Sequence, residues 1–225
     1  MLDSCEGNLP MRLQLSKLWP VLTLTTGAML LLSGAAQAGP IDSSSSGLDQ
    51  AQGCGDAPCA FDVIYNLDAS APVTGNLDIT GSTLDFTISL ASATLSGSDG
   101  AVSSITFSDV TYSGSFAITL DGSGGATITD QIATIAGTVT PDIGGASVFN
   151  AINVNTTGLC TGVDTASPTC GLIFGGPTSD FSADVNGNTR YFRHTVAVSV
   201  IPEPGTALLL GLGLGGLATA TSRRR

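Results

Sequence analysis

Apolar and polar side chains alternate along most of the chain between residues 61 and 200. The clearest run places Leu84, Phe86, Ile88 and Leu90 on one side of an extended segment. A period of two residues puts successive side chains on opposite faces of a strand, so one face can be buried while the other meets water. The region shows neither helical periodicity nor a fixed repeat length. The pattern predicts an all-β domain, an antiparallel β-sandwich or jelly-roll-like fold, with a parallel β-helix as the alternative.

Turn residues and breaks in the alternation divide this region into strands. Asp99-Gly100 and Asn186-Gly187 predict tight hairpin turns, and Asn-Gly is typical of type I′. The Gly-rich run from Asp121 to Gly125 predicts a further turn. The apolar phase slips at Ala91 and again after Phe107, which indicates bulges or bends in those strands.

The first 38 residues have the organisation of a helical secretory signal peptide. A basic segment from Met11 to Lys17 precedes an apolar segment over residues 18–32, and Ala36 and Ala38 form an Ala-x-Ala cleavage motif. Cleavage is expected after Ala38. Because acidic residues precede it, Met11 is the alternative start of translation. An uncleaved N-terminal membrane anchor is the alternative to a signal peptide.

The segment from residue 201 to 225 combines three features in a fixed order. Pro202-Glu203-Pro204 can continue neither a strand nor a helix, because each proline lacks a backbone donor and fixes φ. An uncharged, mostly apolar run over residues 205–222 follows, and as a transmembrane helix it would span roughly 25 Å, just short of a ~30 Å hydrocarbon core. Arg223, Arg224 and Arg225 are expected to stop the helix on the cytoplasmic side.

This order of tripeptide, apolar run and arginines resembles the PEP-CTERM sorting signal of Gram-negative bacteria. The resemblance covers about the last 25 residues. It implies a substrate of exosortase, a membrane cysteine protease-transpeptidase that acts near Pro-Glu-Pro, and an association with exopolysaccharide and biofilm. It also implies a single-pass intermediate in the inner membrane, followed by a cell-surface or extracellular location. An ordinary C-terminal membrane anchor without processing is the alternative.

The charge of the exported part limits its partners. Residues 39–204 contain sixteen acidic residues against Arg190 and Arg193 and no lysine, a net charge near −14. Such a surface repels phosphate backbones, so nucleic acid is excluded as a partner. It suits solubility or the binding of divalent cations.

Four cysteines lie in the exported part. Cys54 and Cys59 belong to a Ser- and Gly-rich segment, residues 39–60, which is expected to be a flexible lead before a β domain over residues 61–200. Cys160 and Cys170 bracket a later loop. Three connectivities are possible, and short loop closure favours Cys54–Cys59 and Cys160–Cys170. Zinc is disfavoured because the spacings are not CxxC and no histidine is nearby.

The sequence offers few candidates for catalysis. His194, the only histidine, shares the core face of its strand with Phe192 and Val196, so a buried, hydrogen-bonded role is expected. No Gly-x-Ser-x-Gly motif occurs, and no cysteine of the exported part is free once the disulfides form. Fifteen aspartates could include the facing carboxylates of a glycosidase, but no spacing selects a pair.

Asp184, Asn186 and Asn188 repeat the first oxygen ligands of a calcium loop. Positions six and twelve should be Gly and Glu but are Thr189 and Thr195, so the EF-hand interpretation fails and a hairpin turn is preferred. Weak Ca²⁺ binding at these three residues remains a prediction, and no other cofactor is expected.

The sequence therefore predicts an exported cell-surface or extracellular-matrix protein. We expect a structural or exopolysaccharide-associated role without catalysis. A secreted hydrolase or a carbohydrate-binding module is the alternative.

Overall fold

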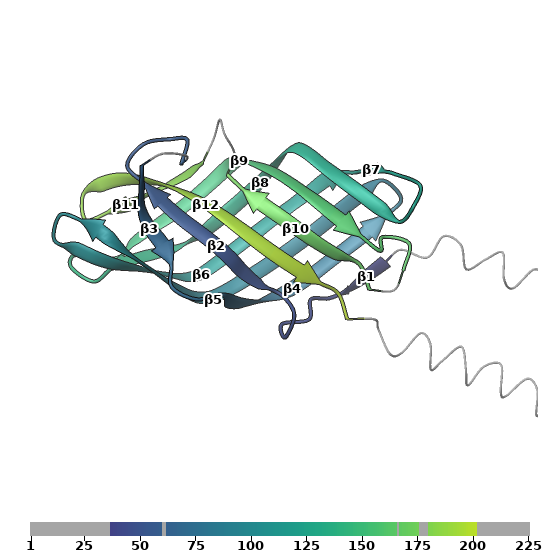
Figure 1. The fold of residues 1–225 in the computed structure, drawn as a ribbon, viewed down its shortest axis with the longest axis horizontal. Coiled ribbons are helices and arrows are strands. Elements are labelled where there is room, and N and C mark those ends of the chain that lie inside the picture. Colours follow the sequence, from purple (N-terminus) through teal and green to yellow (C-terminus); the bar gives the residue numbers. More distant parts are fainter. Residues whose placement is uncertain (1–36, 60–61, 166, 176–179, 202–225) are drawn as a thin grey trace, which may run out of the picture. The chain divides into compact units, whose positions relative to one another are not determined.

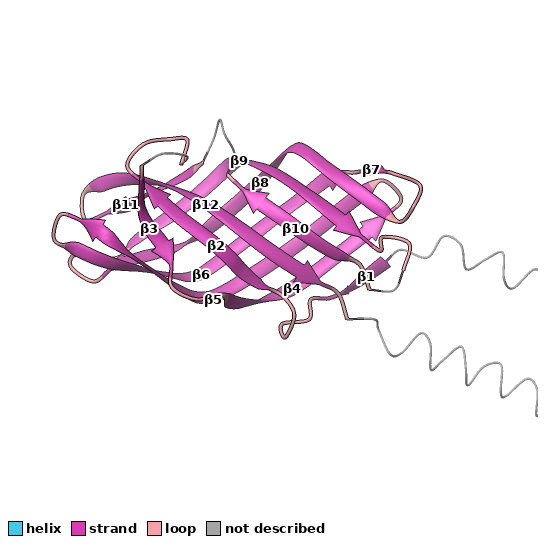
Figure 2. Ribbon diagram, in the orientation of Figure 1, coloured by secondary structure: helices cyan, strands magenta, loops and turns pink. Residues whose placement is uncertain are grey.

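The computed structural model describes residues 37–59, 62–165, 167–175 and 180–201. This part of the chain contains strands and turns and no helix (Figure 2). None of its segments forms an apolar helix long enough to cross a membrane. The predicted signal helix and the apolar run 205–222 lie outside the described residues.

Twelve strands make up the described part, and neighbouring strands are antiparallel. In chain order they are β1 (Gln37–Pro40), β2 (Gly47–Cys54), β3 (Val63–Leu67), β4 (Ala71–Thr80), β5 (Thr83–Asp99), β6 (Val102–Ala117), β7 (Thr119–Leu120), β8 (Gly125–Pro141), β9 (Ser147–Thr161), β10 (Thr169–Phe174), β11 (Phe181–Val185) and β12 (Asn188–Ser199).

The strands form one hydrogen-bonded sheet that closes on itself. The pairing runs β2–β3–β5–β6–β8–β9–β10–β12, and β12 pairs again with β2. β1 and β4 extend the sheet beside β2 and β5, β7 pairs with β8, and β11 pairs with β12. Figure 1 shows β2, β12 and β10 crossing in front of β4, β5, β6 and β8. The antiparallel all-β class is confirmed, and the two facing layers belong to one continuous sheet.

The core lies between these two layers. Phe107 of β6 meets Phe192 of β12 edge to face, with ring centroids 5.0 Å apart. Tyr112 of β6 lies against Phe174 of β10 with a centroid separation of 4.7 Å. The predicted inward run on β5 is confirmed by the burial of all four of its apolar residues, Leu84, Phe86, Ile88 and Leu90. The period-two pattern therefore identified the buried face of this strand correctly.

The predicted break after Phe107 is present. Asp109 has a φ of 52°, and the β6–β8 register shifts between Ser108 and Thr111. β6 therefore has one residue more than β8 at this point, which is a β-bulge, and Val110 is buried in the core. At the other predicted break the β5–β6 register is continuous from Leu90 to Ser92, and Ala91 is exposed. At the β11–β12 hairpin Asn186 and Gly187 have φ values of 52° and 85°, the two positive angles that a type I′ turn needs.

The prediction of a flexible lead over residues 39–60 was wrong. Residues 47–54 form β2, which completes the closure between β12 and β3, and Leu48 and Cys54 are fully buried. The strand was not predicted because the Ser- and Gly-rich composition of residues 39–60 is typical of a linker. Gly53 is required by packing, because a Cβ there would lie 2.6 Å from Cε1 of Phe192. The described β fold thus includes β1 and β2, which lie before the predicted domain start at residue 61.

Candidate processing junction

The C-terminal end of β12 is held firmly against the N-terminal strand. Val200 forms a bridge with Ile41, and the backbone N–H of Ile201 donates to the carbonyl of Pro40 at 3.0 Å. Val200 is buried, whereas Ile201 is 42% exposed. Ile201, the last described residue, is thus hydrogen-bonded within the fold and directly precedes the tripeptide that begins at Pro202.

Further hydrogen bonds fix Ser199 and Val200. The carbonyl of Ser199 accepts from the N–H of Asp42 at 2.7 Å, and its N–H donates to the hydroxyl of Ser46 at 2.7 Å. The N–H of Val200 donates to the carbonyl of Pro168 at 3.1 Å. Chain segments on both sides thus hold the last residues of the domain.

The predicted signal-cleavage bond lies beside this junction. β1 pairs with β4 so that Ala38 opposes Asp78 and Gly39 opposes Leu77. A Cβ on Gly39 would lie 2.5 Å from Cγ1 of Val200, so glycine permits the close approach of β1 and the end of β12. The predicted new N-terminus, Gly39, and the C-terminal junction are therefore neighbours in space.

Several predicted site residues lie outside the described residues. They are Ala36 of the cleavage motif, Pro202, Glu203 and Pro204 of the tripeptide, and Arg223, Arg224 and Arg225. Ala38 is described as part of β1.

Both predicted disulfides are present. Cys160 and Cys170 are directly opposed on β9 and β10, with a Cα–Cα distance of 4.0 Å. Cys54 and Cys59 have a Cα–Cα distance of 5.3 Å, and both are buried. Each bridge closes a short loop, as the sequence spacing predicted.

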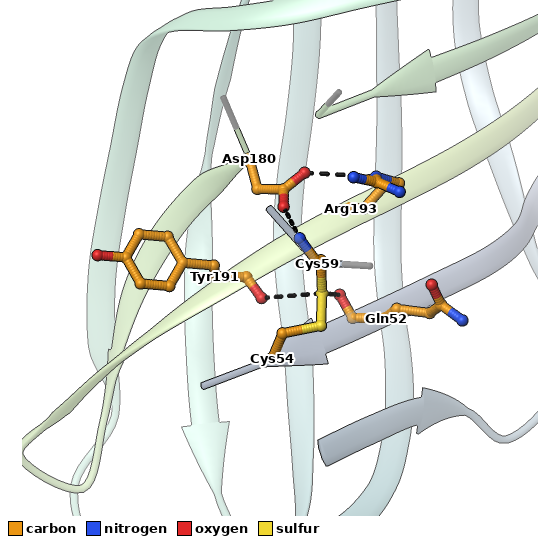
Figure 3. The surroundings of a disulfide bond; sticks show 6 residues. All are labelled: Gln52, Cys54, Cys59, Asp180, Tyr191 and Arg193. Carbon is orange, nitrogen blue, oxygen red and sulfur yellow. Dashed lines mark hydrogen bonds and ion pairs between the residues drawn. A yellow bond between two sulfur atoms is a disulfide. The ribbon is translucent and has the colours of Figure 1, made fainter. Parts of the chain in front are cut away.

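An aspartate that the sequence analysis did not single out supports the first disulfide loop. The carboxylate of Asp180 accepts a hydrogen bond from the N–H of Cys59 and forms an ion pair with Arg193 at 3.4 Å (Figure 3). The Asp180 side chain is fully buried. Its place 121 residues after Cys59 gave no local signal in the sequence.

Arg190 joins the end of β5 to β12 through a second ion pair. Its Nε and one terminal nitrogen donate to the two carboxylate oxygens of Asp99, each at 2.7 Å. Hydrogen bonding to Arg190 lowers the pKa of Asp99. Burial, with the nearby Asp99 charge, raises the pKa of Tyr65 to about 12. Both cationic residues of the exported part are thus engaged in ion pairs within the fold.

His194 has the buried role that its strand pattern predicted. Its Nδ1 lies 2.6 Å from the hydroxyl oxygen of Tyr112, and both residues are fully buried. Burial lowers the pKa of His194 to about 3. The imidazole is therefore neutral at ordinary pH and remote from solvent.

The calcium candidates occupy the β11–β12 hairpin. Oδ1 of Asp184 accepts from the N–H of Gly187 at 3.0 Å, and the carbonyl of Asp184 accepts from Ser147 Oγ at 2.7 Å. Asn186 is a turn residue, and Asn188 starts β12. In the described ranges no group of three or more His, Cys, Asp or Glu side chains could hold a metal ion. The geometry gives Asp184 a turn-stabilising role, and Ca²⁺ binding stays a prediction.

Comparison with known proteins adds one assignment. No curated protein and no solved structure matches the chain. Residues 200–225 match the PEP-CTERM protein-sorting motif. The match starts at Val200, the residue bridged to Ile41, so the domain and the signal adjoin. Residues 200–225 therefore carry a sequence that matches a PEP-CTERM sorting signal, the kind of signal that exosortases are taken to recognise.

Proposed function

We propose that this protein is exported, held in the inner membrane by residues 205–222, and cut near Pro202-Glu203-Pro204 by an exosortase-type membrane protease. The product is released to the cell surface or the extracellular matrix. The observation that carries the proposal is the match to the sorting motif at residues 200–225. The hydrogen bond of Ile201 to Pro40 supports it, because it places the tripeptide directly after a residue held in the fold.

Within the matrix we propose a structural or exopolysaccharide-associated role without catalysis. Ser and Thr supply 42 of residues 39–201. On the outer face of β5 and β6 they oppose one another across the strands, as at Thr87 and Ser113, and at Thr94 and Thr106. Hydroxyls at such positions hydrogen-bond to water or to sugars and carry no charge. Two disulfides and a closed sheet suit a protein that must persist outside the cell.

A carbohydrate-binding module is the second candidate. An open hollow on β4, β5 and β6 is lined by polar groups that can bind sugar hydroxyls, from Asn76, Asp78, Asp85, Thr87 and Ser113. Asp78 and Asp85 are directly opposed, and like charges in such a pair destabilise a sheet unless a partner shares them. Titration of the released protein with a panel of polysaccharides tests this. Binding that Asp78→Asn and Asp85→Asn weaken would favour the module, and absence of binding would favour the structural role.

The processing proposal is tested in the native host with a variant in which Pro202, Glu203 and Pro204 are all alanine. Cell fractionation and tandem mass spectrometry of the C-terminal peptide give the location and the cut position. We expect wild type to lose its tail and leave the inner membrane, and the variant to stay there uncut. Identical full-length forms of both proteins in the inner membrane would show that the tail is only an anchor.

A further inference from the structure

Near the N-terminus of the mature chain, residues 40–46 are hydrogen-bonded to Ser199 and Ile201, directly before the tripeptide. Four hydrogen bonds join these segments. Ile201 N–H donates to the carbonyl of Pro40, and Ser199 N–H donates to the hydroxyl of Ser46. The carbonyl of Ser199 accepts from the N–H of Asp42 and from the hydroxyl of Ser46. We call residues 40–46 the N-terminal clamp.

We propose that the N-terminal clamp is a positioning element for processing, which confines cleavage to peptide bonds after Ile201. The proposal rests on processing by the exosortase-type protease and adds a determinant of its specificity that lies outside the sorting motif. The clamp precedes residue 200, where the motif begins, by more than 150 residues in sequence.

Backbone availability gives the physical reason. A protease that binds an extended substrate needs the backbone N–H and C=O groups around the scissile bond. In residues 199–201 four such groups are already engaged: the N–H and C=O of Ser199, the N–H of Val200 and the N–H of Ile201. Three of these four groups are hydrogen-bonded to the clamp. A protease could reach the Ser199–Val200 and Val200–Ile201 peptide bonds only after the clamp had opened.

Ser46 is the key residue of the clamp. It is buried, and its hydroxyl oxygen is the acceptor for the Ser199 N–H at 2.7 Å. Its carbonyl accepts from the N–H of Val73 at 3.2 Å, which ties the clamp to β4. The adjacent Ser45 is exposed, and its hydroxyl donates to Asp42 Oδ2 within the clamp. Ser45 therefore provides a matched control.

Removal of the signal peptide leaves the clamp complete. The predicted cut after Ala38 takes away Gln37 and Ala38, which pair with Ile79 and Asp78 of β4. The clamp bonds begin at Pro40 and remain in the mature chain. The hydrogen bonds between the clamp and residues 199–201 therefore remain after the signal peptide is removed.

The test uses the full chain in its native host and sequences the C-terminal peptide of the released protein by tandem mass spectrometry. Wild type and Ser45→Ala are expected to retain every residue through Ile201. Ser46→Ala leaves the Ser199 N–H without its acceptor, so we expect C-termini shifted upstream, to Ser199 or Val200. The same C-terminus in Ser46→Ala as in wild type, with both disulfides intact, would overturn the clamp while leaving the processing proposal standing.

A second variant keeps the test decisive if Ser46→Ala does not fold. The double substitution Ile41→Cys with Val200→Cys would place a disulfide across this bridged pair and hold the clamp closed. Because cleavage after Ile201 does not require opening, we expect the disulfide-linked variant to be cut at the wild-type position. A disulfide-linked variant that stays uncut while wild type is processed would overturn the proposal. If wild type itself is never cut, the proposed processing fails and the clamp's role fails with it.

Discussion

The hydroxyl oxygen of Tyr112 lies 2.6 Å from Nδ1 of His194, inside the core between β6 and β12. The imidazole also meets the rings of Phe107 and Phe181, with centroid distances of 5.1 Å and 4.7 Å. This surrounding disfavours a charged imidazole, and burial lowers the pKa of His194 to about 3. The only histidine of the chain is therefore a structural group whose protonation opposes folding.

Stability is predicted to fall as the pH drops below about 6.5, the ordinary pKa of histidine. Between this value and about 3, the unfolded chain binds a proton at His194 that the folded protein excludes. The contribution of the neutral imidazole is fully present above pH 6.5 and is progressively lost towards pH 3. Urea unfolding at a series of pH values in this range measures the effect.

The control for this prediction replaces both partners, Tyr112→Phe with His194→Phe, so that no unpaired hydroxyl remains in the core. The difference in unfolding free energy between wild type and this double variant should shrink or reverse as the pH falls. Carboxylates titrate in both proteins and cancel in the difference. A difference that is constant from pH 7 to pH 4 would contradict the assignment of a buried neutral histidine.

Local patterns in the sequence predicted the fold class and several of its details. Alternation from Leu84 to Leu90 identified a buried face, because burial on one side of a strand requires a period of two. Asn186-Gly187 identified a hairpin, because its turn type needs two positive φ angles. The disulfides followed from loop length. Each of these features depends on residues that lie close together in the chain.

The remainder depends on contacts between distant segments. β2 closes the sheet against β12, whose residues lie more than 130 positions later, and it follows a run of four serines, residues 43–46, in a segment that resembles a linker. The ion pair of Asp99 and Arg190 joins residues 91 positions apart, and the bond from Ser199 to Ser46 spans 153. No local signal marks such partners, so the hydrogen bonds between residues 40–46 and residues 199–201 could not be predicted from the sequence alone.

The ion pair between Asp99 and Arg190 is predicted to stabilise the domain modestly. Both side chains are partly exposed, but the bidentate geometry places the pair at the upper end of the range for surface pairs. Asp99→Asn should lower the free energy of unfolding by roughly 1 kcal/mol. Because hydrogen bonding to Arg190 lowers the pKa of Asp99, this contribution is present above the ordinary aspartate pKa and is lost as the pH falls through the lowered value.

Asp68→Asn is the matched control for this pair, because Asp68 is exposed in the loop between β3 and β4. Its effect on unfolding free energy should be close to zero. High salt should reduce the difference between wild type and Asp99→Asn, since it screens partly exposed charges. Equal changes in unfolding free energy for the two substitutions would show that the ion pair of Asp99 with Arg190 does not stabilise the domain.

Calcium binding is predicted to be weak at most. Asp184 already uses Oδ1 to accept from the turn, and Asn186 and Asn188 lie on the same short hairpin without a further carboxylate ligand from position twelve. Isothermal titration calorimetry with CaCl₂ should give a dissociation constant of ~10⁻⁴–10⁻³ M, the range of extracellular modules. Asp184→Asn should weaken any binding located there. A submicromolar constant would require a complete oxygen cage elsewhere in the chain.

The three terminal arginines are predicted to determine retention in the inner membrane. The apolar run over residues 205–222 is short and contains five glycines, each of which weakens a helix by about 1 kcal/mol relative to alanine. Such a helix is a poor anchor unless its cytoplasmic end is fixed, and moving each arginine into the bilayer centre costs about 2.5–3.5 kcal/mol on insertion scales. Replacing Arg223, Arg224 and Arg225 with glutamine should let uncut protein pass to the periplasm. Replacing them with lysine preserves the charge and should behave as wild type. Fractionation followed by detection of the full-length tail measures both, and retention of the uncharged variant in the inner membrane would show that the apolar run anchors the chain without them.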